Sequence, residues 1–525
     1  MKSDSAFALD RIAFLNMRDF VRLGLAILFI VLVMIYAQST VGGFAGGTLL
    51  IVAAMIGGYM AMNIGANDVA NNVGPAVGSK TLTLTAAILI AAIFEAAGAI
   101  IAGGEVTSTI RKGIISPDAI PDLQTFVWAM MAALLAGALW LNIATYKGLP
   151  VSTTHSIVGG VLGAGIAAGG WGIADWGQVG TIVASWVISP VMGGVIAALF
   201  LYLIKRTITY QQDWGEAARK MVPFLIAVMA WAFVTYLLLK GLKAVWKMDF
   251  LTATAIGLAA ATAVYFAVKP VIQRAAVNLG DQRTAVNKLF VLPLIVAAAL
   301  LSFAHGANDV ANAVGPLAAI YDAVITGGLA EKAAIPPWIM VVGAIGIALG
   351  LALYGPKLIR TVGSEITELD QSRAFCIALA AAITVIVASQ LGIPISSTHT
   401  AIGAVFGVGI LREMIRVNYV RVIAEIRLHH HGEDEAVIEN YLQRFAAASF
   451  HEKGAMMKEL KKKKKRPANL TLSKHERKEL KREYHRDLVK RSLALKIISA
   501  WVITVPLSGA MAAFLFFTIR GILLP

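Results

Sequence analysis

Residues 65–75 read GANDVANNVGP, and residues 306–316 read GANDVANAVGP. Each copy places an aspartate, Asp68 or Asp309, between amide side chains near the end of a long apolar run. A carboxylate in a membrane is costly to bury and is retained where it faces a partner, a cavity or an ion. The repetition of the whole stretch therefore predicts two halves of one functional site.

The composition around these stretches is that of an integral membrane protein. Of the 525 residues, 58% are hydrophobic and only 15% are charged, and the mean hydropathy is +0.73. Because a bilayer core needs roughly 20 apolar residues per helical span, we predict an all-α polytopic membrane protein with about 11–12 transmembrane helices. The apolar runs lie near residues 23–38, 46–64, 83–102, 124–145, 179–204, 221–240, 251–268, 288–305, 338–355, 374–391 and 493–520.

A second pair of motifs follows the first pair in the same order and at nearly the same spacing. Residues 148–165 read GLPVSTTHSIVGGVLGAG, and residues 392–409 read GIPISSTHTAIGAVFGVG. Ordered internal duplication is typical of secondary transporters. We therefore expect two repeats, and counting spans from an N-terminus placed inside the cell gives them inverted topology, with broken helices and re-entrant hairpins.

The expected domain organisation follows from the repeats and from the charge. The net charge is +15, and much of it falls in one polar stretch that contains KKKKKR at 461–466. Basic segments favour the cytoplasmic side, so this stretch and the N-terminus are predicted to be cytoplasmic. It lacks interleaved aromatic residues, so nucleic acid is not an expected partner. The predicted segments are 1–45 with an extra first helix, a first repeat in 46–204, linking helices in 205–287, a second repeat in 288–410 and 492–525, and a basic insertion in 411–491.

The GAND stretches offer the ligands that a hard cation prefers. Carboxylate and amide oxygens suit sodium, whereas a transition metal would prefer imidazole or thiolate. A purely structural alternative, in which each aspartate caps a broken helix, fits the same pattern. The Gly-Pro pair that ends each stretch is expected to break the helix there. The predicted cation ligands are Asn67, Asp68, Asn308 and Asp309.

The second pair of motifs predicts an anion site. In each motif a proline precedes three hydroxyl residues and an apolar stretch of only about 12–15 residues, which is too short to span a bilayer. Proline followed by hydroxyls marks a helix N-terminus, where free N–H groups and partial positive charge attract anions. Ordinary capped helices are the alternative. The predicted anion ligands are Ser152, Thr153, Thr154, Ser396, Ser397 and Thr398, with the amides Asn71 and Asn312.

Other polar residues in apolar surroundings give weaker signals. Glu95 stands alone in IFEAAGA and is a candidate for coupling the cation, with an internal hydrogen bond or salt bridge as the alternative. His155 and His399 follow the hydroxyl runs and are expected to hold the hairpins rather than to contact substrate. His305 precedes only the second GAND stretch, and no role is assigned to it.

Taken together, the paired GAND-V-[AS]-N-x-[VI]-GP and P-[VI]-S-[ST]-T-H segments resemble those of the inorganic phosphate transporter (PiT) family of cation-coupled phosphate symporters. The resemblance implies inverted repeats, re-entrant hairpins, a homodimer, and the cation and phosphate residues named above. One departure is Ala378, which stands where some members of the family have a second glutamate. A coupling scheme with two symmetric glutamates is therefore not expected here.

The predicted function is import of inorganic phosphate across the cytoplasmic membrane by symport with Na⁺ or H⁺, without a cofactor and without a metal other than the coupling cation. A sulfate or other oxyanion permease of the same fold stays open, because hydroxyls and helix termini discriminate poorly between tetrahedral anions. A membrane-embedded phosphotransferase or phosphatase is less favoured, since no nucleophile, general base and metal cluster stand together in the sequence. A passive anion channel would not need duplicated carboxylates.

Overall fold

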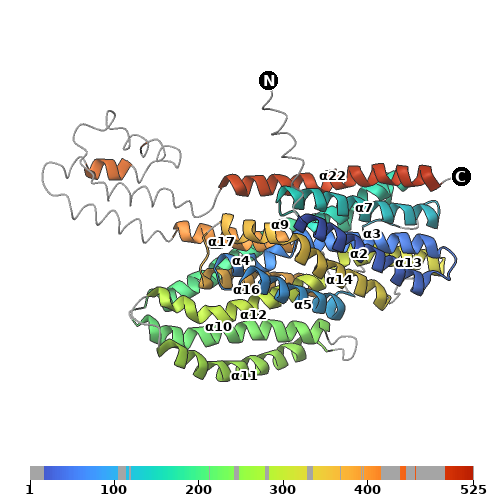
Figure 1. Ribbon diagram of the computed structural model, residues 1–525. Helices are drawn as coiled ribbons and strands as arrows, with labels where there is room; N and C mark the ends of the chain where they lie inside the picture. The colour runs from blue at the N-terminus through green and yellow to red at the C-terminus, as the bar shows by residue number, and fades with distance from the viewer. Residues whose placement is uncertain are drawn as a thin grey trace. The chain divides into compact units, whose positions relative to one another are not determined.

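The computed structural model is mainly helical in the part of the chain that it describes, as the hydropathy pattern predicts (Figure 1). The structure describes residues 17–104, 114–116, 120–211, 213–241, 248–277, 283–327, 335–366, 368–391, 393, 395–414, 438–444, 456 and 491–523. The helical unit that carries both repeats comprises residues up to 408 and from 491 onward, and residues 409–490 form a separate unit. Most of the predicted basic insertion lies outside the described residues.

Eleven helical segments in the described part of the chain are long and apolar enough to cross a membrane. They confirm the predicted runs one for one. The segments are 19–41, 47–78, 84–102, 123–147, 176–209, 214–239, 250–276, 285–326, 337–354, 371–388 and 494–523.

The helices that build this unit have the following bounds, with π-helical turns extending α9, α10 and α15. They are α2 (Met17–Val41), α3 (Gly47–Asn67), α4 (Ala70–Gly78), α5 (Leu84–Ala102), α7 (Leu123–Lys147), α8 (Thr153–Gly169), α9 (Trp176–Ile204), α10 (Trp214–Tyr236), α11 (Phe250–Val277), α12 (Val291–Asp309), α13 (Ala311–Thr326), α14 (Pro337–Tyr354), α15 (Pro356–Arg360), α16 (Gln371–Gln390), α17 (Ser397–Met414) and α22 (Arg491–Leu523).

The GAND-bearing helices are the most buried. In the apolar windows of the segments 47–78, 123–147 and 285–326, 72% to 78% of the residues are buried, whereas in those of 250–276 and 494–523 the share is 17% to 22%. A helix that is apolar all round and buried all round belongs in the interior of a bundle, and one that is apolar but exposed faces lipid. The duplicated aspartates therefore lie at the centre of the helical unit.

Each GAND-bearing helix is interrupted at or next to its aspartate, not at the Gly-Pro pair. α3 gives way to α4 at Asp68 and Val69, and α12 gives way to α13 at Val310, while the prolines lie inside α4 and α13. The predicted position of the break was therefore wrong by one to two turns. A proline removes the hydrogen bond to the carbonyl four residues earlier, here that of Asn71 or Asn312, so it disturbs the turn just after each observed break and does not place the break by itself.

A second cause of the interruption is local. The side chain of Asn71 donates to the carbonyl of Asp68 at 2.8 Å, and the backbone N–H of Asn71 donates to the same carbonyl at 3.0 Å. The helical ladder is thereby tightened to three-residue spacing across this turn. A side chain that competes with the backbone in this way turns one carbonyl out of the regular α-helical pattern.

The two hydroxyl motifs start helices, as predicted. α8 begins at Thr153 and α17 at Ser397, and they contain 17 and 18 residues, slightly more than the apolar stretch of the sequence suggests. Neither is among the eleven spanning segments. Ser152 accepts a hydrogen bond from the N–H of His155 at 3.1 Å, and Ser396 accepts one from the N–H of His399 at 3.0 Å. Both serines are thus N-caps.

We call α8 and α17, which begin at the hydroxyl motifs, the hydroxyl helices. Each packs against the last helix of the other repeat. α8 lies against α22 through glycines that bring the backbones together, because a Cβ at Gly163 would lie 2.2 Å from the carbonyl oxygen of Gly509. α17 lies against α9 in the same way, and a Cβ at Gly407 would lie 2.1 Å from the carbonyl oxygen of Gly194. Small residues at these crossings let helices approach closely in lipid. We call α8 with α22 the first hairpin pair and α17 with α9 the second hairpin pair.

Candidate functional site

The two aspartates accept hydrogen bonds from the hydroxyl helices. The hydroxyl of Thr153 donates to Asp68 Oδ2 at 2.7 Å, and the hydroxyl of Ser397 donates to Asp309 Oδ2 at 2.6 Å. All four side chains are buried, with at most 2% of their surface exposed. Each repeat thus brings its own GAND aspartate against the first turn of its own hydroxyl helix.

Further contacts connect the two repeats. The amide of Asn71 donates to Thr398 Oγ1 at 2.9 Å, and the amide of Asn312 donates to Thr153 Oγ1 at 3.0 Å and to Thr154 Oγ1 at 3.2 Å. The hydroxyl of Thr154 in turn donates to the carbonyl of Ile395 at 3.0 Å. Four sequence-predicted regions, far apart in the chain, therefore form one buried cluster of hydroxyls, amides and carboxylates.

Two predicted cation ligands also hold the segments that lead into the hydroxyl helices. Asn67 donates to the hydroxyl of Thr145 at 2.9 Å and to the carbonyl of Leu149 at 3.1 Å, and its oxygen accepts from the N–H of Val151 at 3.0 Å. Asn308 donates to the carbonyl of Ile395 at 3.3 Å. The amide of Asn67 is fully engaged with protein in this conformation, whereas the oxygen of Asn308 has no hydrogen-bond partner among the described residues.

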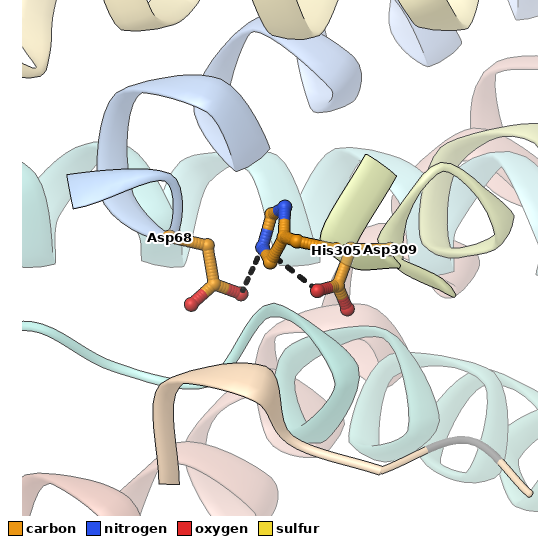
Figure 2. A group of neighbouring side chains, drawn as sticks. All are labelled: Asp68, His305 and Asp309. Carbon is orange, nitrogen blue, oxygen red and sulfur yellow. Dashed lines mark ion pairs between the residues drawn. The ribbon is translucent and has the colours of Figure 1, made fainter. Parts of the chain in front are cut away.

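His305 joins the carboxylates and was not identified from the sequence as a site residue. Its Nε2 lies 2.8 Å from Asp309 Oδ2 and 3.9 Å from Asp68 Oδ2, and Figure 2 shows the ring between the two aspartates. Its Nδ1 lies 2.7 Å from Glu95 Oε2. Nδ1 is hydrogen-bonded to Glu95, whereas Nε2, although close to Asp309, has no hydrogen-bond partner among the described residues.

Glu95 has a second partner, Asn72, whose amide donates to Glu95 Oε1 at 2.6 Å. Hydrogen bonds therefore link Asn72, Glu95 and His305, and the other ring nitrogen of His305 lies close to Asp309. The backbones pack closely here, because a Cβ at Gly306 would lie 2.1 Å from the carbonyl oxygen of Glu95. This places Glu95 next to the site, as its candidate role in coupling requires.

The linked side chains of Asn72, Glu95 and His305 have no polar counterparts in the other half of the duplication. Aligning the GAND stretches sets His305 opposite Ile64 and Asn72 opposite Ala313. Glu95 has Ile347 as its counterpart, since Gly306 packs against the carbonyl of Glu95 as Gly65 packs against that of Ile347. A search for repeated polar residues passes over residues that occur once. The signal in the sequence was the spacing of His305 and Asp309, which puts them one turn apart on the same helix face.

The cluster has the features of a cation site. Asp68, His305 and Asp309 each offer a ligand atom, and these atoms lie within 4.8 Å of one another. The oxygens of Asn71 and Asn308 are buried without a hydrogen-bond partner among the described residues. Buried oxygen acceptors normally find a donor or a cation, and carboxylate and amide oxygens suit a hard cation. The carboxylates of Asp68 and Asp309 and these two amide oxygens therefore fit a coupling cation carried as substrate.

The cluster also has the features of an anion site. The first turns of α8 and α17 meet it with their hydroxyls, and the first N–H groups of a helix have no partner within the helix. The N-terminal end of a helix also carries partial positive charge. Donors from both repeats and acceptors for a cation thus lie within one cluster, with no lysine or arginine among the residues named.

Comparisons with known proteins agree with this geometry. The profile of the phosphate transporter family matches residues 64–512. A chain assigned as a phosphate permease in Helicobacter pylori (strain J99) is 53% identical over 511 residues, covering 95% of each chain. One from Thermococcus kodakarensis is 40% identical over 369 residues, covering 70% of this chain and 90% of its own. A solved structure, "The sodium-dependent phosphate transporter", superposes with a TM-score of 0.72 at 31% identity, covering 91% of this chain and all of that one.

The resemblance carried by the repeated motifs is thereby confirmed, as is the prediction of a multi-pass helical membrane protein. The chain belongs to the phosphate transporter family.

Proposed function

We propose that this protein is a secondary active transporter that imports inorganic phosphate by symport with a coupling cation, Na⁺ or H⁺. The observation that carries the proposal is the meeting of two buried aspartates with the hydroxyl-rich first turns of two helices. Phosphate would be held by the hydroxyls of residues 152–154 and 396–398 and by the amides of Asn71 and Asn312. The cation would be held by Asn67, Asp68, Asn308 and Asp309.

The coupling follows from competition for the same hydroxyl protons. In this conformation Thr153 and Ser397 donate to the aspartates, so these donors are not available to an anion. Two buried carboxylates would also repel phosphate, since charges interact strongly where water is excluded. A cation bound to the carboxylates weakens both effects: it neutralises the charge and frees the hydroxyls to turn toward phosphate. Phosphate and cation therefore bind best together, which is the requirement for symport.

Phosphate fits the site better than sulfate does. Phosphate is partly protonated at neutral pH and can donate a hydrogen bond, whereas sulfate only accepts. A carboxylate such as Asp68 or Asp309, close to the anion, would accept a hydrogen bond from phosphate, which offsets part of the repulsion, whereas sulfate would be repelled without this compensation. A site built to hydrogen-bond a donor rejects an analogue that lacks it, because its own buried acceptor is left unpaired.

The family consists of transporters, and we infer transport rather than phosphoryl transfer for this chain. We further infer that it lies in the cytoplasmic membrane as a homodimer, with inverted repeats and with the N-terminus and residues 411–491 in the cytoplasm. Protease access to the basic insertion in membrane vesicles of known sidedness would test the orientation. Protection of the insertion in right-side-out vesicles, and cleavage in inverted ones, is the expected result.

Transport is tested by uptake of labelled phosphate and labelled sulfate into proteoliposomes with imposed sodium or proton gradients. We expect phosphate uptake that rises with an inward gradient of one of the two cations and little uptake of sulfate. The same vesicles are assayed for hydrolysis of a phosphoester. Gradient-independent flux would indicate a channel, equal sulfate uptake a general oxyanion permease, and phosphoester hydrolysis an enzyme; each would contradict the proposal.

A further inference from the structure

Four aromatic rings form a continuous stack directly next to the hydroxyl runs. The ring of His155 lies 3.7 Å from that of Trp186, and the ring of His399 lies 3.7 Å from that of Trp501, measured between centroids. The two imidazoles meet edge to face, with centroids 4.3 Å apart. The order Trp186, His155, His399, Trp501 is symmetric, because the two histidines are counterparts in the two repeats and so are the two tryptophans. None of these rings contacts the carboxylates described above.

The stack crosses the boundary between the two hairpin pairs at every step. His155 belongs to α8 and Trp501 to α22, which together form the first hairpin pair, whereas His399 and Trp186 belong to α17 and α9 of the second. Every ring contact in the stack therefore joins one hairpin pair to the other. The indole N–H of Trp501 also donates to the carbonyl of Pro150 at 3.2 Å, which ties α22 to the residues that lead into α8.

The imidazoles contribute to this boundary mainly through their ring faces and edges. Both imidazoles are almost fully buried. Neither nitrogen of His155, nor Nε2 of His399, has a hydrogen-bond partner in the described part of the chain. Nδ1 of His399 lies 3.5 Å from the carbonyl of Trp186, at the outer limit of a hydrogen bond. Aromatic rings that pack face to face or edge to face attract each other beyond the effect of the area that they bury.

The stack is one residue removed from the anion ligands. Thr154 and Thr398 directly precede the two histidines, and Thr154 reaches across to the carbonyl of Ile395 on the other hairpin. Next to the site, Thr154 therefore contacts the segment that leads into α17. One residue further along each helix, the rings of His155 and His399 contact each other. Hydrogen bonds weaken steeply beyond about 3.2 Å, so a shift of about 1 Å between the hairpins would remove donors from a bound anion.

We propose that His155 and His399, stacked between Trp186 and Trp501, are positioning residues that set the separation of the two hydroxyl runs and thereby the affinity and size selectivity for the tetrahedral anion. The inference rests on the proposed function, because it takes phosphate as the anion held by both runs. It assigns the histidines no contact with phosphate or cation.

The experiment compares His155→Ala, His399→Ala, and the ring-preserving variants His155→Phe and His399→Phe in proteoliposomes. We expect the alanine variants to raise KM for phosphate at least tenfold. Arsenate is a slightly larger tetrahedral anion, so the alanine variants should also change the ratio of its KM to that of phosphate at least threefold. The phenylalanine variants should stay within about threefold of wild type in KM, because they keep an aromatic ring between the two hairpin pairs.

The matched control is Phe233→Ala, which removes a partly buried ring from an aromatic pair with Phe303, with ring centroids 5.6 Å apart, that involves neither hairpin. It should lower the amount of active protein at most, leaving KM and the arsenate ratio unchanged. Alanine variants that behave like this control, with a lower Vmax and an unchanged KM, would overturn the inference. So would phenylalanine variants as impaired as the alanine ones. Failure of the wild-type protein to take up phosphate would instead refute the proposed function.

Discussion

At the scale of single residues, the account depends on Asp68 and Asp309 as the points where cation and anion sites meet. Each accepts a hydroxyl hydrogen bond from the first turn of α8 or α17, the helices that we propose to hold the anion. Repetition made these residues predictable, because a carboxylate that appears twice in an apolar sequence is hard to explain by packing. The other half of the duplication has no polar counterpart of His305, Glu95 or Asn72. That hydrogen bonds link these three side chains could not be predicted before the helices were placed in space.

The first prediction concerns the two aspartates. Asp68→Asn and Asp309→Asn should each abolish cation-dependent phosphate uptake, because the amide keeps the shape of the side chain but removes the charge that attracts the cation. Uptake of labelled phosphate under an inward cation gradient is the measurement. Asp175→Asn is the control, since Asp175 caps α9 and asparagine caps a helix equally well. Wild-type cation dependence in both aspartate variants would show that the cation binds elsewhere.

The second prediction concerns the Glu95–His305 pair. His305→Ala removes the ring that lies 2.8 Å from Asp309 and 2.7 Å from Glu95, leaving both carboxylates without this partner. Truncating one member of a buried charged pair typically costs about 3–5 kcal/mol. We therefore expect the apparent affinity for the coupling cation to change by at least tenfold, in a cation titration at saturating phosphate. An unchanged titration would mean that the pair has only a packing role.

At the scale of elements, hydropathy predicted the spanning helices because one span requires a length of apolar sequence that few other structures need. The positions of both helix breaks were predicted wrongly, and in the first repeat the reason is that the amide of Asn71 competes for the carbonyl of Asp68, upstream of the proline. The partners of α8 and α17 could not be predicted either. Each packs on the last helix of the other repeat. The spacing of motifs along the chain does not indicate which helix of the other repeat a given helix will contact.

The third prediction tests the glycine crossing of the first hairpin pair. A Cβ at Gly159 would lie 2.5 Å from Ser508 Oγ and 2.6 Å from the carbonyl oxygen of Val505. Gly159→Ala should therefore force α8 and α22 apart, at a cost of about 1–3 kcal/mol typical of overpacking, and lower the Tm in detergent. Gly180→Ala is the control, because no atom lies within 4 Å of its added Cβ. Equal Tm values for the two variants would argue against a tight crossing.

The fourth prediction concerns the start of α7. Asp122 accepts a hydrogen bond from the backbone N–H of Thr125 at 2.7 Å, and this bond lowers the pKa of the carboxyl below its ordinary value. A lowered pKa in the folded state means that the cap stabilises the protein above the ordinary pKa of aspartate and loses this contribution as the pH falls through the folded value. Asp122→Ala should cost about 1 kcal/mol at neutral pH. Thermal unfolding at neutral and at strongly acidic pH checks this, and a Tm difference that persists undiminished in acid would contradict it.

At the scale of the whole molecule, two repeats of one chain contribute to a single site, and neither completes it alone. The amide of Asn312, in the second repeat, donates hydrogen bonds to the hydroxyls of Thr153 and Thr154 in the first. The amide of Asn71, in the first repeat, donates one to the hydroxyl of Thr398 in the second. The sequence predicted the duplication and the chemistry of each half. It could not predict that each half would donate hydrogen bonds to the other, since that depends on how the helices pack.

The most direct test of the central claim is the dependence of phosphate affinity on the coupling cation, measured by calorimetric titration of the purified wild-type protein at varied sodium concentration and pH. If the cation frees the hydroxyls from Asp68 and Asp309, the Kd for phosphate should fall by about 5- to 150-fold as one of the two cations is raised, the range typical of coupled sites. By linkage, phosphate must tighten cation binding by the same factor. A Kd for phosphate that is independent of both sodium and pH would contradict the account.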